Sequence, residues 1–390
     1  MQQLAQRATT LTPSLTLAID AKAKILKAEG VDVCGFGAGE PDFDTPQFIK
    51  DAAAQALAAG FTKYTPSSGI PELRDAIAGK LKNENGLDYK RSQIIVNCGA
   101  KHSCYNVILA TCQAGDEVII PAPYWLSYPE MAKLADASPV IVETTEASGF
   151  KISPEQFRDA MTPATKLIIL NSPGNPTGSV YSREELQALA EVALEEDILM
   201  LSDEIYEKIT YDGVQPVSLA SLGKEVYDLT ITVNGFSKAY AMTGWRLGYV
   251  AAPDPIAAAI DSIQSHSTSN PTSFAQKGAL AGLKGDQSFI GEMVKAFAER
   301  RAYMYDRLTK IPGVTCVKPM GAFYMLPNIS SFGLNSTDFA SKLLDDQKVA
   351  LVPGIAFGSD AHVRLSYACS MENIQKGLDR IEAFCASLAK

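Results

Sequence analysis

The sequence predicts an α/β fold with a second, smaller α+β domain. Three observations support this prediction. Seven short runs rich in Ile, Val and Leu lie between residues 93 and 253. Amphipathic helical patterns separate several of these runs, which favours an open sheet with helices on its faces. The two ends of the chain instead combine long helical patterns with short strand-like runs.

The seven runs show little alternation between apolar and polar residues, which is typical of strands buried on both faces. They are residues 93–100, 116–123, 138–145, 165–176, 197–206, 229–238 and 246–253. Helices are expected between some of them, at residues 101–113, 182–196 and 253–264. Ligands of such sheets bind beyond the carboxyl ends of the strands. Polar residues that follow the runs are therefore candidate site residues.

The ends of the chain predict the second domain. Residues 14–29 and 287–310 carry helical patterns, and a closing helix is expected near MENIQKGLDRIEAFCASLA. Short strands are expected around VTCVKPMGAFYML, VALVPG and AHVRLSYA. We expect residues 1–45 to be an N-terminal segment of the small domain, residues 46–285 the large domain, and residues 286–390 the rest of the small one.

Composition and charge exclude several classes of function. The chain has 390 residues, of which 46% are hydrophobic and 20% charged, and its net charge is −9. An acidic protein is a poor partner for nucleic acid or an anionic membrane, since both favour a basic face. No apolar run approaches the roughly 20 residues that cross a bilayer. Because the first residues also lack an apolar signal-peptide core, we expect a cytoplasmic protein.

Metal and hydrolase chemistry find no support in the sequence. The seven cysteines form no CxxC pair, and the three histidines, His102, His266 and His362, lie far apart. A histidine-ligated metal site is therefore not expected. The hydrolase motif GxSxG is absent. GFGAGE at residues 35–40 imitates a dinucleotide fingerprint, but it leads into Pro-Asp instead of a helix.

Polar residues follow several of the predicted strands. Asp203 and Tyr206 follow the run ILML, and Asn175 lies in NSPGNPTG. Residues 99–101 (GAK) join a strand to a helix, and Lys238 ends the run LTITVNGFSK. Each has an ordinary explanation when taken alone: a helix cap, a turn, a strand–helix junction or a surface lysine. Together they place a carboxylate, a phenol, an amide, a helix N-terminus and an amine at one edge of the sheet.

The stretch SKAYAMTGWRLGYVAA carries two cations, Lys238 and Arg246, with no acid between them. A lysine in an apolar setting near another cation is favoured as a neutral amine, which can form a Schiff base. Ser237, Arg246 and a helix N-terminus together suit a phosphate, although Arg246 could instead pair with a distant carboxylate. An aspartate would keep a pyridine nitrogen protonated. This set predicts pyridoxal 5′-phosphate (PLP) as cofactor.

The chain resembles the class I aminotransferases of PLP fold type I, and among them the aspartate aminotransferase subgroup Ib. The resemblance runs from about Leu11 to the C-terminus. Its motifs are GAGEPDFDTP (37–46), KYTPSSGIPELRDAI (63–77), NSPGNPTG (171–178), SDEIY (202–206), SKAYAMTGWRLGY (237–249) and VRLSYA (363–368). It implies a large PLP-binding domain with a mostly parallel seven-stranded sheet, and a small domain from both termini.

The resemblance also implies a role for each cofactor-binding residue. Lys238 forms a Schiff base with PLP and carries the proton between the substrate Cα and cofactor carbon C4′. Asp203 pairs with the pyridine nitrogen. The other implied contacts are Tyr206 and Asn175 to the phenolic oxygen, Trp125 to the ring face, and Ser237, Arg246 and the backbone N–H groups of Ala100 and Lys101 to the phosphate. Tyr64 reaches the phosphate of the other subunit, so a homodimer is implied.

The implied substrate contacts begin with Arg364, which binds the α-carboxylate bidentately. Its planar fork matches a carboxylate in a way that lysine cannot copy. Asn175, Trp125 and the backbone of Gly39 complete this part of the site. A structural salt bridge is the alternative for Arg364.

The distal carboxylate of the substrate is expected to meet Lys101 and Thr16. No arginine occurs from Leu247 to Glu299, where another aspartate aminotransferase subgroup carries one. The motif here is GAK instead of GGK, a small departure. The ordinary alternatives are a surface charge at a helix start for Lys101 and a hydroxyl near a helix N-cap for Thr16. We therefore expect aspartate and glutamate as donors, with 2-oxoglutarate and oxaloacetate as acceptors.

Two other functions stay open. A relative of different specificity would accept prephenate, aromatic amino acids, alanine or kynurenine. A regulator that binds the cofactor without turnover belongs to another class. Such regulators usually carry a basic winged-helix domain, which does not fit into this acidic chain.

Overall fold

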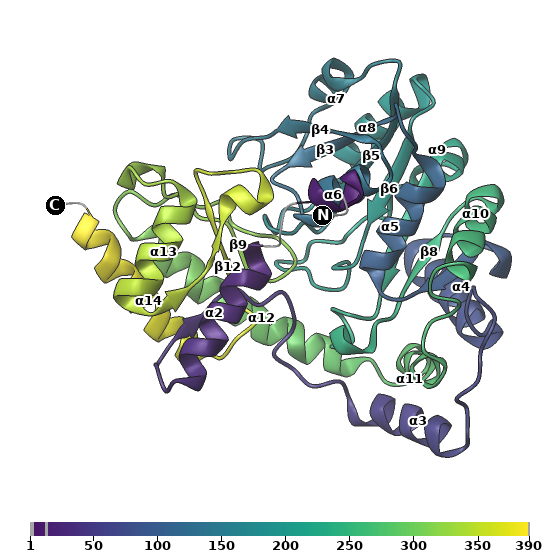
Figure 1. Cartoon of the computed structure of the whole chain (residues 1–390), viewed down its shortest axis with the longest axis horizontal. Coiled ribbons are helices and arrows are strands. Elements are labelled where there is room, and N and C mark those ends of the chain that lie inside the picture. The colour runs from purple at the N-terminus through teal and green to yellow at the C-terminus, as the bar shows by residue number, and fades with distance from the viewer. Residues whose placement is uncertain (1–3, 12–14, 389–390) are drawn as a thin grey trace.

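A seven-stranded sheet forms the centre of the computed structural model, which describes residues 4–11 and 15–388 apart from the side chains of residues 6, 15–18 and 20 (Figure 1). The strand order is β2-β8-β7-β6-β5-β3-β4. Their bounds are β2 (Ile94–Asn97), β3 (Glu117–Ala122), β4 (Ser138–Glu143), β5 (Thr165–Asn171), β6 (Leu199–Asp203), β7 (Thr230–Gly235) and β8 (Gly248–Ala251). Each lies inside one of the seven predicted runs, so the predicted sheet is confirmed.

Strand direction decides which residues meet at one edge of the sheet. Neighbouring strands are parallel except β8, which is antiparallel to both β2 and β7. Asn171 at the end of β5 is in register with Asp203 at the end of β6. Gly235 at the end of β7 pairs with Gly248 at the start of β8. The loops that follow β5, β6 and β7 and the loop that precedes β8 therefore open on the same edge.

The sheet is buried on both faces because alternate residues of a strand point to opposite sides. Leu167 and Leu201 belong to an apolar cluster with residues of α5, α6 and α10. Ile168 and Met200 belong to another cluster, with residues of α8. The helices around the sheet are α3 (Gln47–Ala58), α4 (Pro71–Asn85), α5 (Ala100–Thr111), α6 (Ser127–Leu134), α7 (Pro154–Ala160), α8 (Arg183–Glu195), α9 (Lys224–Leu229), α10 (Asp254–Ser265) and α11 (Ser273–Lys284).

Local sequence signals explain where several helices begin and end. Ser182 accepts a hydrogen bond from the backbone of Glu185, whose side chain returns to Ser182, so a capping box starts α8. Pro71 starts α4, where its missing N–H removes no helical hydrogen bond. Gly86 ends α4 in the left-handed conformation at φ 71°.

The remaining elements come from both ends of the chain. They are α1 (Gln6–Thr9), α2 (Leu15–Ala28), β1 (Cys34–Gly35), α12 (Ser288–Thr309), β9 (Tyr324–Met325), α13 (Ser336–Gln347), β10 (Val349–Ala350), β11 (Val352–Pro353), β12 (Val363–Ser366) and α14 (Met371–Leu388). β1 pairs in parallel with β10, and β12 lies between β11 and β9. Ala23 of α2 belongs to one apolar cluster with Leu344 of α13 and Ala350 of β10. The predicted domain boundaries, after residues 45 and 285, stay a prediction.

None of the helices in the described part of the chain is long and apolar enough to cross a membrane. The same residues contain no cluster of His, Cys, Asp and Glu that could hold a metal ion.

Candidate active site

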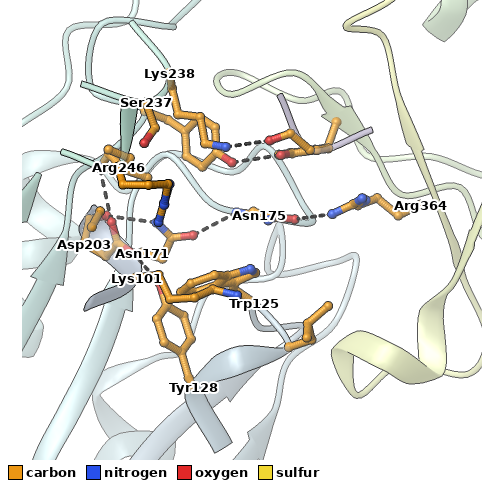
Figure 2. A pocket seen from close by; sticks show the side chains of 16 residues that line it. Lys101, Trp125, Tyr128, Asn171, Asn175, Asp203, Ser237, Lys238, Arg246 and Arg364 are labelled. Atoms are coloured by element: carbon orange, nitrogen blue, oxygen red, sulfur yellow. Dashed lines mark hydrogen bonds between the residues drawn. The ribbon is translucent and has the colours of Figure 1, made fainter. Parts of the chain in front are cut away.

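A cavity of about 200 Å³ opens at the edge of the sheet where these strand ends meet (Figure 2). Its lining comprises Gly39, Ala100, Lys101, Trp125, Leu126, Tyr128, Asn171, Asn175, Asp203, Ile205, Tyr206, Ser237, Lys238, Arg246, Tyr324 and Arg364. Every predicted site residue except Tyr64 and Thr16 therefore lines one cavity.

Lys238 lies three residues beyond β7 and is partly buried. Its Nζ donates a hydrogen bond to the carbonyl oxygen of Gly39, 2.5 Å away. The same nitrogen lies 5.7 Å from the ring centroid of Tyr206 and 5.9 Å from that of Phe323. The amine thus sits against two aromatic rings, with a neutral carbonyl as its hydrogen-bond partner.

The surroundings lower the pKa of Lys238 to about 8. Burial is the largest cause, because it disfavours the charged form. The positive charges of Arg364 and Arg246 act in the same direction, while Glu40 and Asp203 oppose them. A substantial fraction of the amine is therefore neutral, and so nucleophilic, near pH 8.

Asp203 ends β6 and is 3% exposed. Its Oδ2 accepts a hydrogen bond from the Tyr128 hydroxyl at 2.6 Å and from the Cys104 thiol at 3.7 Å. Its Oδ1 accepts one from the backbone N–H of Ile205 at 3.2 Å. Burial raises the pKa of Asp203, while these donors and the charge of Lys238 lower it. Across the described residues Asp203 forms no ion pair, so this carboxylate is buried without a cation in direct contact.

The N-terminus of α5 and Arg246 form a second feature of the cavity. The first hydrogen bond of the α5 backbone runs from Ser103 N to Gly99 O at 3.1 Å, so the N–H groups of Ala100 and Lys101 precede it. Arg246 donates to the carbonyls of Thr243 at 2.8 Å and Cys98 at 3.3 Å.

Gly99 allows this close approach, because a Cβ there would lie 2.4 Å from Nη2 of Arg246. Its φ of +94° also disfavours other residues. In the described part of the chain no carboxylate pairs with Arg246. Free N–H groups, a guanidinium and the nearby Ser237 make an anion-binding site.

Arg364 lies on β12 and is 2% exposed. Its Nη1 donates to Oδ1 of Asn175 at 3.0 Å and its Nη2 to the carbonyl of Gly37 at 2.8 Å. Its Cζ lies 4.5 Å from the ring centroid of Tyr324 and 4.9 Å from that of Phe357. Nε is buried without a partner, and no carboxylate among the described residues pairs with the guanidinium. The alternative of a structural salt bridge therefore does not describe Arg364.

Two predicted residues lie elsewhere. Tyr64 is 88% exposed, and its expected contact with another subunit stays a prediction. Thr16 is the second residue of α2, and its side chain lies outside the described part of the structure. Its expected partner Lys101 places Nζ 4.9 Å from the ring centroid of Trp125, inside the cavity.

The structure adds polar residues that the sequence reasoning missed. Asn171 donates to the carbonyl of Asp203 at 2.9 Å and accepts from the backbone N–H of Asn175 at 2.9 Å. The hydroxyls of Tyr324 and Tyr206 lie 2.8 Å apart. Asn171 and Tyr324 occur inside NSPGNPTG and GAFYML, two stretches already singled out. Tyr128 lies three residues after Trp125, in the first turn of α6, and its ring packs edge-on against the Trp125 ring.

This arrangement defines a class of site. An amine of lowered pKa, a buried carboxylate and two guanidinium groups surround one cavity, and neither guanidinium has an anionic partner among the described residues. Figure 2 shows Arg364 reaching Asn175 from the side opposite to Asp203. Such a cavity suits ligands that bring a phosphate and a carboxylate and that react with the lysine amine.

Known proteins then identify the family. The model of class I and II aminotransferases matches residues 31–381. The chain is 53% identical to an aspartate aminotransferase of Bacillus subtilis, covering 98% of each chain. It is 47% identical to an aspartate/prephenate aminotransferase of Nitrosomonas europaea, covering 97% of this chain and 98% of the other. The structure of the Thermus thermophilus aspartate aminotransferase with maleate matches with a TM-score of 0.95 and 44% identity, covering 98% and 100%. The chain belongs to the class I and II aminotransferases, and its fold is theirs.

Proposed function

We propose that this protein is a PLP-dependent aspartate aminotransferase. It moves the amino group of L-aspartate to 2-oxoglutarate, giving oxaloacetate and L-glutamate. The observation that carries the proposal is the meeting of Lys238 and Arg364 in one cavity. The first is an amine, and the second is a buried guanidinium with no anionic partner in the part of the chain that the structure describes. Relatives about half identical over nearly the whole chain carry the name aspartate aminotransferase.

The residues present fit PLP. Gly99 leaves the space in which Arg246 meets the N-terminus of α5, and this cradle suits the phosphate. Asp203 is a buried carboxylate that gains a partner when a protonated pyridine nitrogen approaches. Trp125 supplies a flat ring beside it. When bound, PLP supplies an aldehyde for amine chemistry and a protonated ring that withdraws electrons from the substrate Cα.

Lys238 would hold the cofactor through its amine and would act as the general base. Its neutral amine accepts the proton from the substrate Cα, and a positioned base of this kind contributes about 10²–10⁴-fold to the rate. A pKa of about 8 suits this work, since a base is most effective with a pKa near the operating pH. Asp203 stays ionised and stabilises positive charge on the ring nitrogen.

Arg364 binds the α-carboxylate of the substrate. Asn175 already accepts from Arg364 through Oδ1, so its Nδ2 is available to donate to a ligand. The nearby rings of Tyr324 and Phe357 help to hold the guanidinium in place. Lys101, with Thr16, is proposed to contact the distal carboxylate, and a flexible lysine selects shape less strictly than an arginine fork.

Prephenate is the second candidate acceptor. The relative from Nitrosomonas europaea is named an aspartate/prephenate aminotransferase, which favours this alternative over the aromatic, alanine and kynurenine types. Both activities would use the same cavity.

A homodimer with shared active sites is part of the proposal. Tyr64 exposes 88% of its surface in the single chain, which suits an aromatic residue that is covered in an assembly. Sedimentation analysis of the purified protein should give twice the mass of the chain, and Tyr64→Phe should weaken PLP binding.

Two measurements test the function. Borohydride treatment of the protein incubated with PLP should leave a pyridoxyl tag on Lys238, located by peptide mass. Initial rates should then rank donors and acceptors, with aspartate and 2-oxoglutarate giving the highest kcat/KM and prephenate deciding the second candidate. A protein that carries the tag but shows no half-transamination with aspartate would be a binding protein and not an enzyme.

A further inference from the structure

The two oxygens of the Asp203 carboxylate have unequal surroundings. Oδ2 has two side-chain donors, the Tyr128 hydroxyl at 2.6 Å and the Cys104 thiol at 3.7 Å. Oδ1 has one donor, the backbone N–H of Ile205 at 3.2 Å. A carboxylate oxygen accepts about two hydrogen bonds. Oδ2 is therefore fully used, and Oδ1 keeps acceptor capacity for a ligand in the cavity that Asp203 lines.

The two donors come from different helices and are themselves fixed. Tyr128 lies in the first turn of α6 and is 2% exposed, and Cys104 lies in α5 and is fully buried. The ring of Tyr128 packs edge-on against Trp125, with centroids 5.2 Å apart. The hydroxyl therefore has little freedom to leave Asp203.

We propose that Tyr128 is a positioning residue that acts through Asp203, with Cys104 in a lesser role. Tyr128 keeps the carboxylate ionised and turned so that Oδ1 is the oxygen offered to the pyridine nitrogen. This inference rests on the proposed function, because it assigns Tyr128 a role in binding PLP through Asp203.

The physical reason is that a buried carboxylate without an ion pair tends to take up a proton. A hydroxyl that donates to the carboxylate opposes this tendency, and a hydrogen bond to a charged group is stronger than a neutral one. The titratable groups that face Asp203 are the neutral Cys104 thiol and Tyr128 hydroxyl on their helices, the neutral Tyr206 hydroxyl after β6, and the Lys238 amine beyond β7. Burial and the charge of Asp203 also raise the pKa of Tyr128 well above its usual value, so Tyr128 remains a donor.

The test is Tyr128→Phe, which removes the hydroxyl and keeps the ring against Trp125. Without this donor the carboxylate becomes more basic and draws the shared proton away from the pyridine nitrogen. The ring then carries less positive charge, so the pH midpoint of the absorbance change of bound PLP should move upward. The rate constant of the half-reaction with aspartate should fall about tenfold, the size expected for a lost hydrogen bond to a charged group. KM for aspartate should stay unchanged, since Tyr128 is proposed not to touch the substrate.

Two further variants complete the experiment. Cys104→Ala should move the midpoint in the same direction by less, since a thiol is a weak donor. Tyr124→Phe, in the segment between β3 and α6 and outside the contacts of Asp203, should change neither quantity. Should Tyr128→Phe fail to fold, the Cys104→Ala midpoint alone decides the inference, and an unmoved midpoint overturns it. A folded, PLP-bound Tyr128→Phe with wild-type midpoint and rate also overturns it. A wild-type protein that shows no PLP absorbance refutes the proposed function instead.

Discussion

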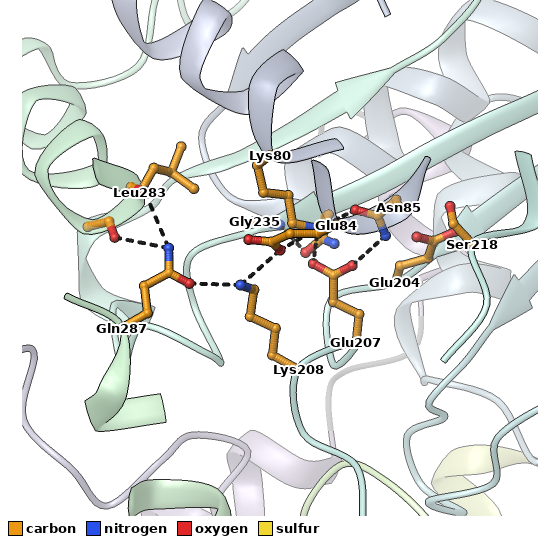
Figure 3. A network of polar contacts seen from close by, with 12 residues as sticks. Lys80, Glu84, Asn85, Glu204, Glu207, Lys208, Ser218, Gly235, Leu283 and Gln287 are labelled. Carbon is orange, nitrogen blue, oxygen red and sulfur yellow. Dashed lines mark hydrogen bonds and ion pairs between the residues drawn. The ribbon is translucent and has the colours of Figure 1, made fainter. Parts of the chain in front are cut away.

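The end of β6 and the residues that follow it carry charged side chains on two sides. The charges on one side are paired within the protein, and those on the other side are not paired with any described residue. Toward the cavity this stretch presents Asp203 and Tyr206. Away from the cavity it presents Glu207 and Lys208, which join a network with α4 and with the residue before α12 (Figure 3). It also presents Glu204, which accepts from Ser202 and Ser218. One stretch of six residues thus contributes to a ligand site and to a structural core.

The far-side charges are matched within the protein. Lys80 binds both Glu207 and Asn85, the latter at 2.8 Å, and its side chain is 5% exposed. Lys208 pairs with Glu84 at 2.9 Å and bonds Gln287 at 2.8 Å. Figure 3 shows these groups interlinked. Their mutual contacts compensate for the loss of hydration on burial.

The cavity-side charges are not matched. Asp203, Lys238 and Arg364 form no ion pair with any described residue, and Nε of Arg364 lacks a partner altogether. Burying a charge without a partner costs free energy. A fold therefore keeps such a charge where a ligand supplies the opposite charge. The comparison teaches that pairing, more than burial, separates structural charges from those kept for a ligand.

The strongest test of this contrast is Lys238→Ala. The variant loses the general base and the point of cofactor attachment, so transamination should fall at least about 10⁴-fold. Its thermal stability should stay close to that of the wild type, because Lys238 holds no other charge in place. Lys277→Ala is the matched control, a lysine over the ring of Phe61 that pairs with Glu72, and should keep full activity. More than one per cent residual activity in Lys238→Ala would contradict the assignment.

Lys80→Met should produce the opposite result. It leaves Glu207 buried without its cation, and breaking one side of a buried pair costs about 3–5 kcal/mol of unfolding free energy. The kcat/KM for aspartate of the folded variant should change less than about threefold, because Lys80 lies outside the cavity lining.

Denaturant unfolding of the apoprotein measures this cost. Lys82→Met provides the control, since the exposed pair of Lys82 with Asp88 is worth only about 0–1 kcal/mol. Equal stability losses in the two variants would remove the distinction between paired and exposed charges.

Glu204 has hydrogen-bond donors but no ion pair among the described residues, and we expect it to make the folding stability depend on pH. Its Oε1 accepts from the hydroxyls of Ser202 and Ser218 at 2.8 Å each, and from Leu219 N at 3.3 Å. Burial, followed by the charge of Glu207, raises its pKa from 4.5 to about 7. Between pH 4.5 and about 7 the folded state therefore keeps a proton on Glu204 that the unfolded state has released. Folding stability from this group is therefore full below pH 4.5 and lost as the pH rises to about 7.

Glu204→Gln removes this dependence. The difference in unfolding free energy between wild type and variant should fall by about 3 kcal/mol as the pH rises from 4.5 to above 7, at about 1.36 kcal/mol per pH unit. Denaturant titrations of both apoproteins across this range measure it. A constant difference would mean that Glu204 is ionised throughout.

Much of this organisation could be predicted from the sequence. The seven strands were visible because burial on both faces leaves unbroken runs of Ile, Val and Leu. Asp203 and Lys238 stood out because they end such runs. β1, at Cys34–Gly35, escaped prediction because two residues carry no periodicity, and its partner β10 begins at Val349.

The missed contacts depend on tertiary geometry. Tyr324 meets Tyr206 across 118 residues of chain, and no local pattern reports such a contact. Tyr128 could have been noticed from its spacing to Trp125, but its target Asp203 could not. The sequence also could not tell which charges find partners. Arg301 and Arg364 are both 2% exposed, and only the structure separates them.

The last prediction compares these two arginines. The same substitution is made at an arginine that has an internal anion and at one that does not have one among the described residues. Arg301 pairs with Asp212 at 2.7 Å and donates to the carbonyl of Pro319 at 2.8 Å. The hydrogen-bond partners of Arg364 within the described residues are all uncharged. Arg364→Lys should lower kcat/KM for aspartate about 30-fold, roughly 2 kcal/mol, since lysine cannot bind a carboxylate bidentately. Unfolding free energy should change little.

Arg301→Lys should do the reverse, with lower stability and nearly unchanged kcat/KM in the folded enzyme. The two variants make the same substitution at the same burial, so the change in side-chain size is the same in both, although Arg301 lies in α12 and Arg364 in β12. Among the described residues, Arg301 pairs with an anion and Arg364 does not. An unchanged kcat/KM in Arg364→Lys would show that the substrate carboxylate binds elsewhere, and the missing partner of Arg364 would then need another explanation.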